Sequence, residues 1–216
     1  ETSTKGSLRF MRLAAATSFV ATGTYAGWDT GFQEVPLEIV GRAPDQLTTI
    51  ARRREGNSVW TFDGRNAWYF AVNSAVPFTL ALSGGNLAGA RLEALVALAP
   101  ARLQEAFGRW QVTKSVIDDQ PVLMLRGTNP GEPPVNFYFD ASGLLVRMLR
   151  WNDTTVGAVP TQYDFSDYRE VGGVRRPFQW VKTSTANQVT FIVKEIRPNV
   201  GIDAARFAKP VATRAR

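Results

Sequence analysis

The alternation of apolar and polar residues is the main structural signal in this chain, and it recurs in short segments separated by turn residues. Residues 159–180 show it best, because two aromatic-rich segments are joined there by Gly172 and Gly173. Both glycines accept the positive φ angles that a tight hairpin turn requires. Asp63 and Gly64 are a second hairpin signal of this kind. The pattern predicts a meander of antiparallel β-hairpins.

The strand-like segments extend over most of the chain and are separated by Asp, Asn, Gly and Pro residues that favour turns. The predicted strands are residues 17–28, 35–42, 46–54, 59–62, 67–72, 110–117, 122–127, 135–139, 144–151, 161–169, 174–183 and 189–197. A sheet of about 11–12 strands curls strongly, so it needs something to fill its concave side.

Residues 86–107 interrupt the strands with strong helix formers. Arg91 and Glu93 are the only charged residues between Leu87 and Pro100. A helix that is apolar on most sides must be buried on more than one side. Pro100 is expected to divide the segment in two, because proline cannot donate an interior helical hydrogen bond.

These elements predict one α+β domain over residues 1–216, in which an incomplete antiparallel barrel wraps around the inserted helical segment. Residues 203–207 are expected to form a short helical turn, and residues 208–216 a basic tail. Residues 1–16 are predicted to be a helix or a linker. A signal peptide over residues 5–23 is the alternative, since Lys5, Arg9 and Arg12 precede an apolar stretch there.

The composition removes many kinds of chemistry. The chain contains no cysteine and no histidine, which excludes disulfides, thiolate nucleophiles, Ser-His-Asp triads and the usual zinc and haem ligands. The adjacent carboxylates Asp118 and Asp119 lie in a predicted turn, and Asp164 and Asp167 are spaced to face opposite sides of a strand. We therefore assign no catalytic residue, no metal and no cofactor, and we expect a protein that is not an enzyme.

The chain carries a formal net charge of +6, with 25 Lys and Arg residues against 19 Asp and Glu residues. This excess favours anionic partners, such as an acidic protein or an anionic membrane surface. The candidate docking residues are Arg52, Arg53, Arg54, Arg175 and Arg176. Single-stranded nucleic acid is disfavoured, because the neighbouring aromatic residues are assigned to the core face rather than to base stacking.

The concave side of the sheet is the expected place for a ligand. An apolar helix there is either a permanent plug or a lid over a cavity, and the sequence does not separate these alternatives. The candidate cavity residues are Trp60, Trp68, Phe70, Phe78, Leu92, Leu95, Val96, Leu103 and Trp110.

Several stretches resemble a known domain. They are FDGRNAW at residues 62–68, and, in the second half, VLMLRGTNPGEPPVNFYFDASGLLVRMLRW, PTQYDFSDYREVGGVRRPFQW and IRPNVGIDAARFAKP. Together they resemble the domain that follows the haem-binding part of certain bacterial multihaem c cytochromes, labelled photosynthetic reaction-centre cytochrome subunits. That domain in turn is similar to the LolA, LolB and LppX fold of periplasmic lipoprotein and lipid carriers. No CxxCH motif is present, so any haem belongs elsewhere.

The resemblance implies an exported, periplasmic, membrane-associated protein that binds or docks and does not catalyse. Our first hypothesis is an accessory or docking subunit of a membrane-bound electron-transfer complex, such as a photosynthetic reaction centre, with a membrane protein complex or c-type cytochrome as partner. The alternative is a periplasmic lipid or lipoprotein carrier that holds acyl chains between the sheet and the helices. Both rest on analogy, because a fold does not determine a function.

Overall fold

The computed structural model describes residues 17–73, 76–155 and 157–211. They form one antiparallel sheet of 13 strands in the order β6-β5-β4-β3-β2-β1-β13-β12-β11-β10-β9-β8-β7. The strands are β1 (Ser18–Gly27), β2 (Val35–Arg42), β3 (Gln46–Arg53), β4 (Gly56–Phe62), β5 (Ala67–Asn73), β6 (Val76–Leu82), β7 (Arg109–Ile117), β8 (Gln120–Thr128), β9 (Val135–Phe139), β10 (Leu145–Thr154), β11 (Gly157–Val171), β12 (Val174–Ser184) and β13 (Gln188–Pro198).

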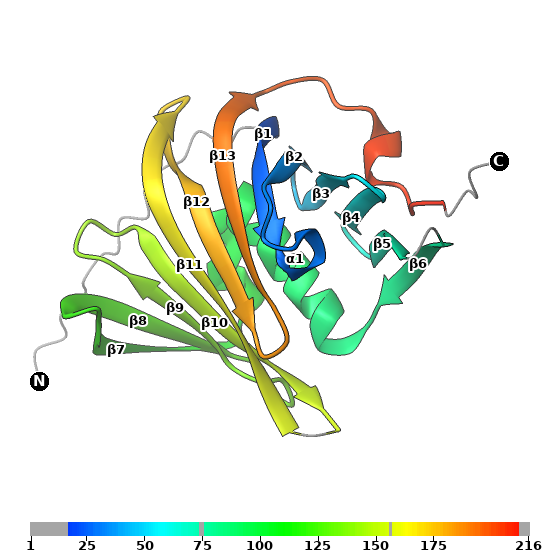
Figure 1. The fold of residues 1–216 in the computed structure, drawn as a ribbon. Helices are drawn as coiled ribbons and strands as arrows, with labels where there is room; N and C mark the ends of the chain where they lie inside the picture. Colours follow the sequence, from blue (N-terminus) through cyan, green and yellow to red (C-terminus); the bar gives the residue numbers. More distant parts are fainter. Residues whose placement is uncertain (1–16, 74–75, 156, 212–216) are drawn as a thin grey trace, which may run out of the picture.

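The sheet curves around one helical segment and stays open, because its outermost strands β6 and β7 do not pair with each other (Figure 1). This architecture confirms the predicted incomplete barrel around an inserted helix. The sequence prediction omitted β6, in which Pro77 lies opposite Val72 of β5. Proline is tolerated at that position because β6 is an edge strand, and no further strand requires its missing N–H group.

The tight turns form where the sequence predicted them. Gly172 and Gly173, with φ angles of 59° and 79°, join β11 to β12. Asp118 and Asp119 turn β7 into β8 with φ angles of 50° and 60°. These two carboxylates therefore shape a hairpin, since short polar side chains tolerate left-handed backbone conformations.

The inserted segment consists of α1 (Gly84–Leu98) and the 3-10 helix η2 (Pro100–Ala106), so the chain breaks before Pro100 as expected. Three sides of α1 are buried. Leu92 and Leu95 pack toward β9, β10 and β11, Leu98 packs toward β1, β2 and β13, and Ala94 packs against Phe62. This arrangement explains why the helix sequence lacks a polar face.

The convex face of β2 to β6 is covered by the C-terminal segment, which includes the 3-10 helix η3 (Ala204–Phe207). Phe207 is buried beneath the guanidinium of Arg42. The hydroxyls of Thr48 and Thr79 donate hydrogen bonds to the carbonyls of Arg206 and Pro210. This segment therefore shields a face that would otherwise be open to water. The predictions for residues 1–16 and for the tail beyond residue 211 lie outside the described residues.

Gly23 tests the pairing of β1 with β13, where the register shifts between Thr22 and Gly23. A Cβ atom at residue 23 would lie 1.9 Å from the backbone oxygen of Ile192. We expect Gly23→Ala to lower the free energy of unfolding by about 2–4 kcal/mol, because backbone atoms must move. Urea denaturation measures this loss. Gly201→Ala is the matched control, since no atom lies within 4 Å of the added Cβ, and equal midpoints for the two variants would contradict the prediction.

Candidate functional site

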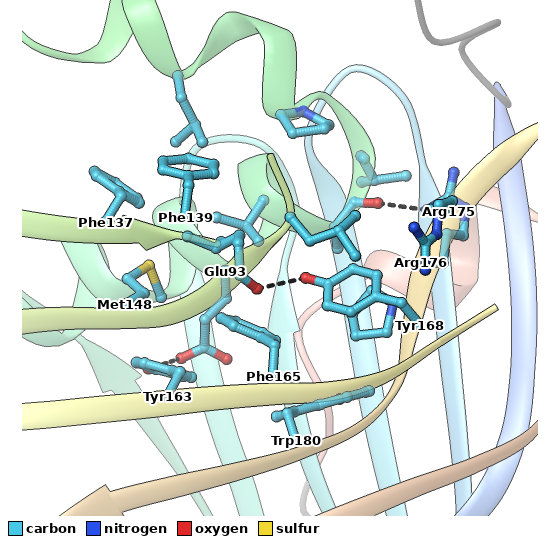
Figure 2. Close-up of a pocket in the computed structure, with 18 of the residues that line it drawn as sticks. Glu93, Phe137, Phe139, Met148, Tyr163, Phe165, Tyr168, Arg175, Arg176 and Trp180 are labelled. Carbon is cyan, nitrogen blue, oxygen red and sulfur yellow. Dashed lines mark hydrogen bonds between the residues drawn. The ribbon is translucent and has the colours of Figure 1, made fainter. Parts of the chain in front are cut away.

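The helical segment does not fill the concave side of the sheet. A cavity of about 1320 Å³ lies between the sheet and α1 with η2, lined mainly by apolar and aromatic side chains. Figure 2 shows Phe137, Phe139, Met148, Phe165 and Trp180 around it. The volume exceeds the roughly 300–1,000 Å³ of ordinary small-molecule sites. The described part of the chain therefore has room for a large apolar ligand.

Four of the nine predicted cavity residues line the cavity: Trp60, Val96, Leu103 and Trp110. Trp60 is held between the rings of Tyr25, at 5.8 Å, and Tyr69, at 5.1 Å. Trp110 lies 5.1 Å from Phe107 and 5.8 Å from Phe137, centroid to centroid. These aromatic contacts hold both tryptophans in place without filling the cavity.

The prediction needs correction for Trp68 and Phe70, which do not line the cavity. They alternate along β5 with Ala67 and Ala71, which are buried on the concave side. Successive side chains of a strand point to opposite faces. Trp68 and Phe70 therefore belong to the convex face, together with their cross-strand partners Thr61 and Thr79.

Leu92, Leu95 and Phe78 are also absent from the cavity wall. Leu92 and Leu95 are buried against Phe137, Met148 and Tyr163, so they dock α1 onto the sheet. Phe78 lies on the edge strand β6, where its ring contacts Tyr69 and remains 38% exposed. Helical periodicity identified the apolar positions of the helix, but it did not show which of them face the sheet and which face the cavity.

The cavity wall holds a polar cluster that the sequence analysis did not predict, formed by Glu93, Tyr163 and Lys182. Figure 2 shows Glu93 and Tyr163 of this cluster. Glu93 Oε1 accepts hydrogen bonds from Tyr163 Oη at 2.6 Å and from Lys182 Nζ at 2.8 Å. The ammonium also lies 5.2 Å from the Tyr163 ring centroid. The only sequence signal for this cluster was Glu93 itself, the single acid within an apolar helix.

Burial and the neighbouring charge shift the pKa values of Glu93 and Lys182 in opposite directions. Burial disfavours the Glu93 carboxylate, yet the Lys182 charge and two hydrogen bonds leave its pKa lowered. Burial likewise disfavours the Lys182 ammonium, while Glu93 leaves its pKa raised. Burial raises the pKa of Tyr163, and the Glu93 charge adds to this. The pair is therefore ionised and the phenol is neutral at pH 7.

Arg150 of β10 fixes the position of the helix beside the polar cluster. It is buried, and it donates hydrogen bonds to the Gly85 carbonyl and to Asn152 Oδ1. A Cβ atom on Gly89 would lie 2.5 Å from the guanidinium carbon. Only glycine at residue 89 lets α1 approach this charged group so closely.

Arg176 lies at the other end of the cavity-facing side of β12, near Arg175 and Tyr168 (Figure 2). Its Nη1 donates a hydrogen bond of 2.8 Å to the Ala97 carbonyl, near the end of α1. Its guanidinium also lies 5.4 Å from the Phe19 ring centroid. Burial lowers the pKa of Arg176. Arg175, in contrast, is exposed.

The five predicted docking arginines do not form one surface. Arg53 is only 13% exposed and donates hydrogen bonds to the carbonyls of Asp29 and Val72, so it joins the 3-10 helix at Trp28–Thr30 to the end of β5. Asp29 follows the end of β1, whereas the Phe19 ring beside Arg176 lies at its start. Ten strand residues separate these ends by roughly 33 Å. The prediction of Arg53 as a docking residue is therefore corrected.

Of the remaining arginines, Arg52 forms an ion pair of 2.6 Å with Glu38, and Arg54 is exposed. Within residues 17–73, 76–155 and 157–211, no group of three or more acidic side chains is placed to hold a metal ion. No helix in the same ranges has the length and apolar character to cross a membrane.

Comparison with known proteins identifies solved structures with a similar architecture. No family model and no curated protein matches the sequence. A solved domain from Vibrio parahaemolyticus, described as an outer membrane lipoprotein-sorting protein, has a TM-score of 0.61 at 13% identity, with 91% of each chain covered. A LolA superfamily protein from Nitrosomonas europaea gives 0.53 at 14% identity, with 89% of each chain covered. A DUF1329 family protein from Desulfovibrio piger gives 0.59 at 10% identity, with coverage of 89% and 90%.

The chain has the LolA-like fold. The resemblance to this fold inferred from the sequence is thereby supported over almost the whole length of the chain. At such low identities the likeness concerns the fold alone. The link to cytochrome subunits is not among these findings and stays a prediction. The cavity and the polar cluster are thus features of a LolA-like half-barrel.

Glu93→Gln tests the polar cluster. The side chains of Glu93 and Lys182 are 34% and 29% exposed, toward the cavity that they line. We expect the substitution to lower the free energy of unfolding by about 2 kcal/mol at neutral pH, between the losses for buried and for surface pairs. Urea denaturation of both proteins measures this difference, with Glu105→Gln in the exposed Arg102 pair as the matched control.

The two pKa shifts determine how the stabilisation by Glu93 and Lys182 changes with pH. Because the pKa of Glu93 is lowered on folding, its stabilisation is complete above the ordinary value of 4.5 and disappears as the pH falls through the lower folded value. The pKa of Lys182 is raised, so its stabilisation is complete below the ordinary value of 10.5 and is lost only at higher pH. A difference between wild type and Glu93→Gln that does not shrink in acid would contradict the ion pair.

Proposed function

We propose that this protein is a carrier that holds acyl chains in the cavity between its sheet and the helices α1 and η2. The observation that carries the proposal is the cavity itself, about 1320 Å³ in volume and lined mainly by side chains such as Phe137, Met148 and Trp180. Such a lining has no partner for a polar solute along most of its length, whereas it matches an alkyl chain.

The cavity is also accessible. Val112 of β7 and Leu123 of β8 line it, yet they are 61% and 42% exposed. Neither η2 nor another described element covers these side chains, so the cavity is open to solvent along the β7–β8 hairpin. Exposed apolar residues that continue a cavity are typical of a ligand-binding opening.

The comparisons support a carrier role by analogy of fold. The structural neighbour from Vibrio parahaemolyticus is described as an outer membrane lipoprotein-sorting protein. Transfer of this role to the present chain includes an exported, periplasmic location and binding without catalysis, as the sequence resemblance implied. The first sequence hypothesis, a docking subunit of an electron-transfer complex, gains no support from the separated arginines or from the structural neighbours.

Val96→Trp tests the proposal, because Val96 lines the cavity from α1. We expect the larger side chain to occupy the space of a ligand and to weaken binding of the neutral apolar dye N-phenyl-1-naphthylamine at least about tenfold. Dye fluorescence measures the affinity. The free energy of unfolding is expected to change by less than about 1 kcal/mol, because the indole enters open volume rather than packed core.

The matched control is Val211→Trp, which adds the same side chain at an exposed position away from the cavity. It is expected to bind the dye like the wild type. Native mass spectrometry of the wild-type protein is expected to show a co-purifying lipid that is diminished in Val96→Trp. A wild-type protein that binds neither dye nor lipid, or a Val96→Trp variant with unchanged affinity, would refute the carrier proposal.

A further inference from the structure

The cavity is apolar but carries an excess of positive charge. Its charged lining consists of five cations and two carboxylates, namely Arg102, Lys114, Arg175, Arg176, Lys182, Glu93 and Asp140. A neutral acyl chain would make no favourable electrostatic interaction with this excess of positive charge. Charges around a cavity with apolar walls are screened less than charges on an open surface. The cavity therefore favours an anionic ligand.

Four of these five cations are either paired with a carboxylate or exposed to solvent. Lys182 is neutralised by Glu93 at 2.8 Å, and Arg102 pairs with Glu105 at 3.2 Å. Lys114 and Arg175 are exposed. Asp140 uses one carboxylate oxygen to accept hydrogen bonds within its own turn, from Ser142 and Leu144.

Arg176 is different from these four cations. It is half-buried, and among the described residues no carboxylate lies within 4.0 Å of its guanidinium. Its only hydrogen bond in the same part of the chain goes to the Ala97 carbonyl, which leaves most of its five N–H donors free. A desolvated guanidinium without an anion is unfavourable, and a carboxylate or phosphate would correct this with charge-assisted hydrogen bonds.

An apolar surface leads away from Arg176 along the cavity. Trp180 lies on the same strand face, and Phe165 is its cross-strand partner on β11. Lys182, six residues beyond Arg176, marks a point roughly 20 Å away along β12. An amphiphile with its headgroup at Arg176 would therefore have its alkyl chain against these two aromatic rings.

We propose that the cavity binds an amphiphile with an acidic headgroup, a carboxylate or a phosphate, whose oxygens accept hydrogen bonds from Arg176 while its alkyl chain lies along Trp180 and Phe165. This inference rests on the proposed carrier function and specifies the class of ligand. It also assigns a role to Arg176 beyond its contact with α1. The headgroup specificity belongs to this one guanidinium.

The test compares ligands that share one chain and differ in the headgroup. Oleate, 1-oleoyl-lysophosphatidate and oleyl alcohol compete for the cavity against N-phenyl-1-naphthylamine. We expect wild-type protein to bind at least one of the two acidic ligands about tenfold or more tighter than the alcohol, as charge-assisted hydrogen bonds allow. The tighter of the two acidic ligands identifies the headgroup as carboxylate or phosphate. Inorganic phosphate without a chain is expected not to displace the dye.

Three variants separate the role of Arg176 in binding from its role in structure. Arg176→Gln is expected to lose the preference for the acidic ligand while it binds oleyl alcohol within about twofold of wild type. Arg176→Lys retains the charge and is expected to keep most of the preference. Arg54→Gln removes an exposed arginine that does not line the cavity and is the matched control, expected to behave like wild type.

The outcomes distinguish the two proposals. Equal affinity of wild type for all three oleyl ligands, or an equal loss of all three in Arg176→Gln, overturns the acidic-headgroup inference and leaves the carrier proposal standing. Displacement of the dye by inorganic phosphate alone, without a preference for acidic oleyl ligands, also overturns it in favour of a site for a small anion. No binding of any oleyl ligand or of the dye to wild type refutes the carrier proposal itself.

Discussion

The burial of a single apolar helix inside a strongly curved sheet is the constraint on which the rest of this structure depends. α1 has 15 residues, a length of about 22 Å, and it must serve the concave side of 13 strands. It meets this demand by packing on three sides, through Leu92 and Leu95, through Leu98 and through Ala94. Because the helix is too small to fill the concavity, a cavity remains beside it.

The polar contacts of the cavity wall hold the helix in this position. Glu93 connects α1 to β11 and β12 through Tyr163 and Lys182. Arg150 reaches the start of α1 and Arg176 reaches its end, each through a backbone carbonyl. Buried charges are costly unless they are paired. The paired Glu93 and Lys182 thus act in structure, whereas Arg176 retains free N–H donors beside the cavity among the described residues.

The two faces of the open sheet differ in how they are covered. A closed barrel is accessible only through its ends, whereas here β6 and β7 remain unpaired with each other and leave the sheet open along one side. On the convex side, the C-terminal segment covers β2 to β6 with Phe207 and with backbone carbonyls. On the concave side of β7 and β8, no element within residues 17–73, 76–155 and 157–211 covers Val112 and Leu123. The described part of the fold thus shields one apolar face and leaves apolar side chains of another exposed, namely Val112 and Leu123.

Local chemistry in the sequence determined the strands, the turns and the position of the inserted helix. Gly172 and Gly173 permit the positive φ angles of a tight hairpin turn, and Pro100 ends α1 because it lacks an N–H donor. The sequence analysis did not predict β6, which contains Pro77. A strand tolerates proline there only because no further described strand pairs with β6 on its outer side, and a local pattern does not show this. The lack of histidine and cysteine limits the chemistry that this chain could perform in any fold.

The tertiary structure alone decided which side chains meet. Glu93 and Lys182 are 89 residues apart in sequence, so no local pattern joins them. Trp60 lines the cavity while Trp68 does not, because sheet pairing places them on opposite faces. Arg53 and Arg176 belong to similar arginine runs in the sequence, yet Arg53 binds the carbonyls of Asp29 and Val72 and Arg176 lines an apolar cavity. Contacts between distant strands depend on curvature and register, which the sequence specifies only through the whole fold.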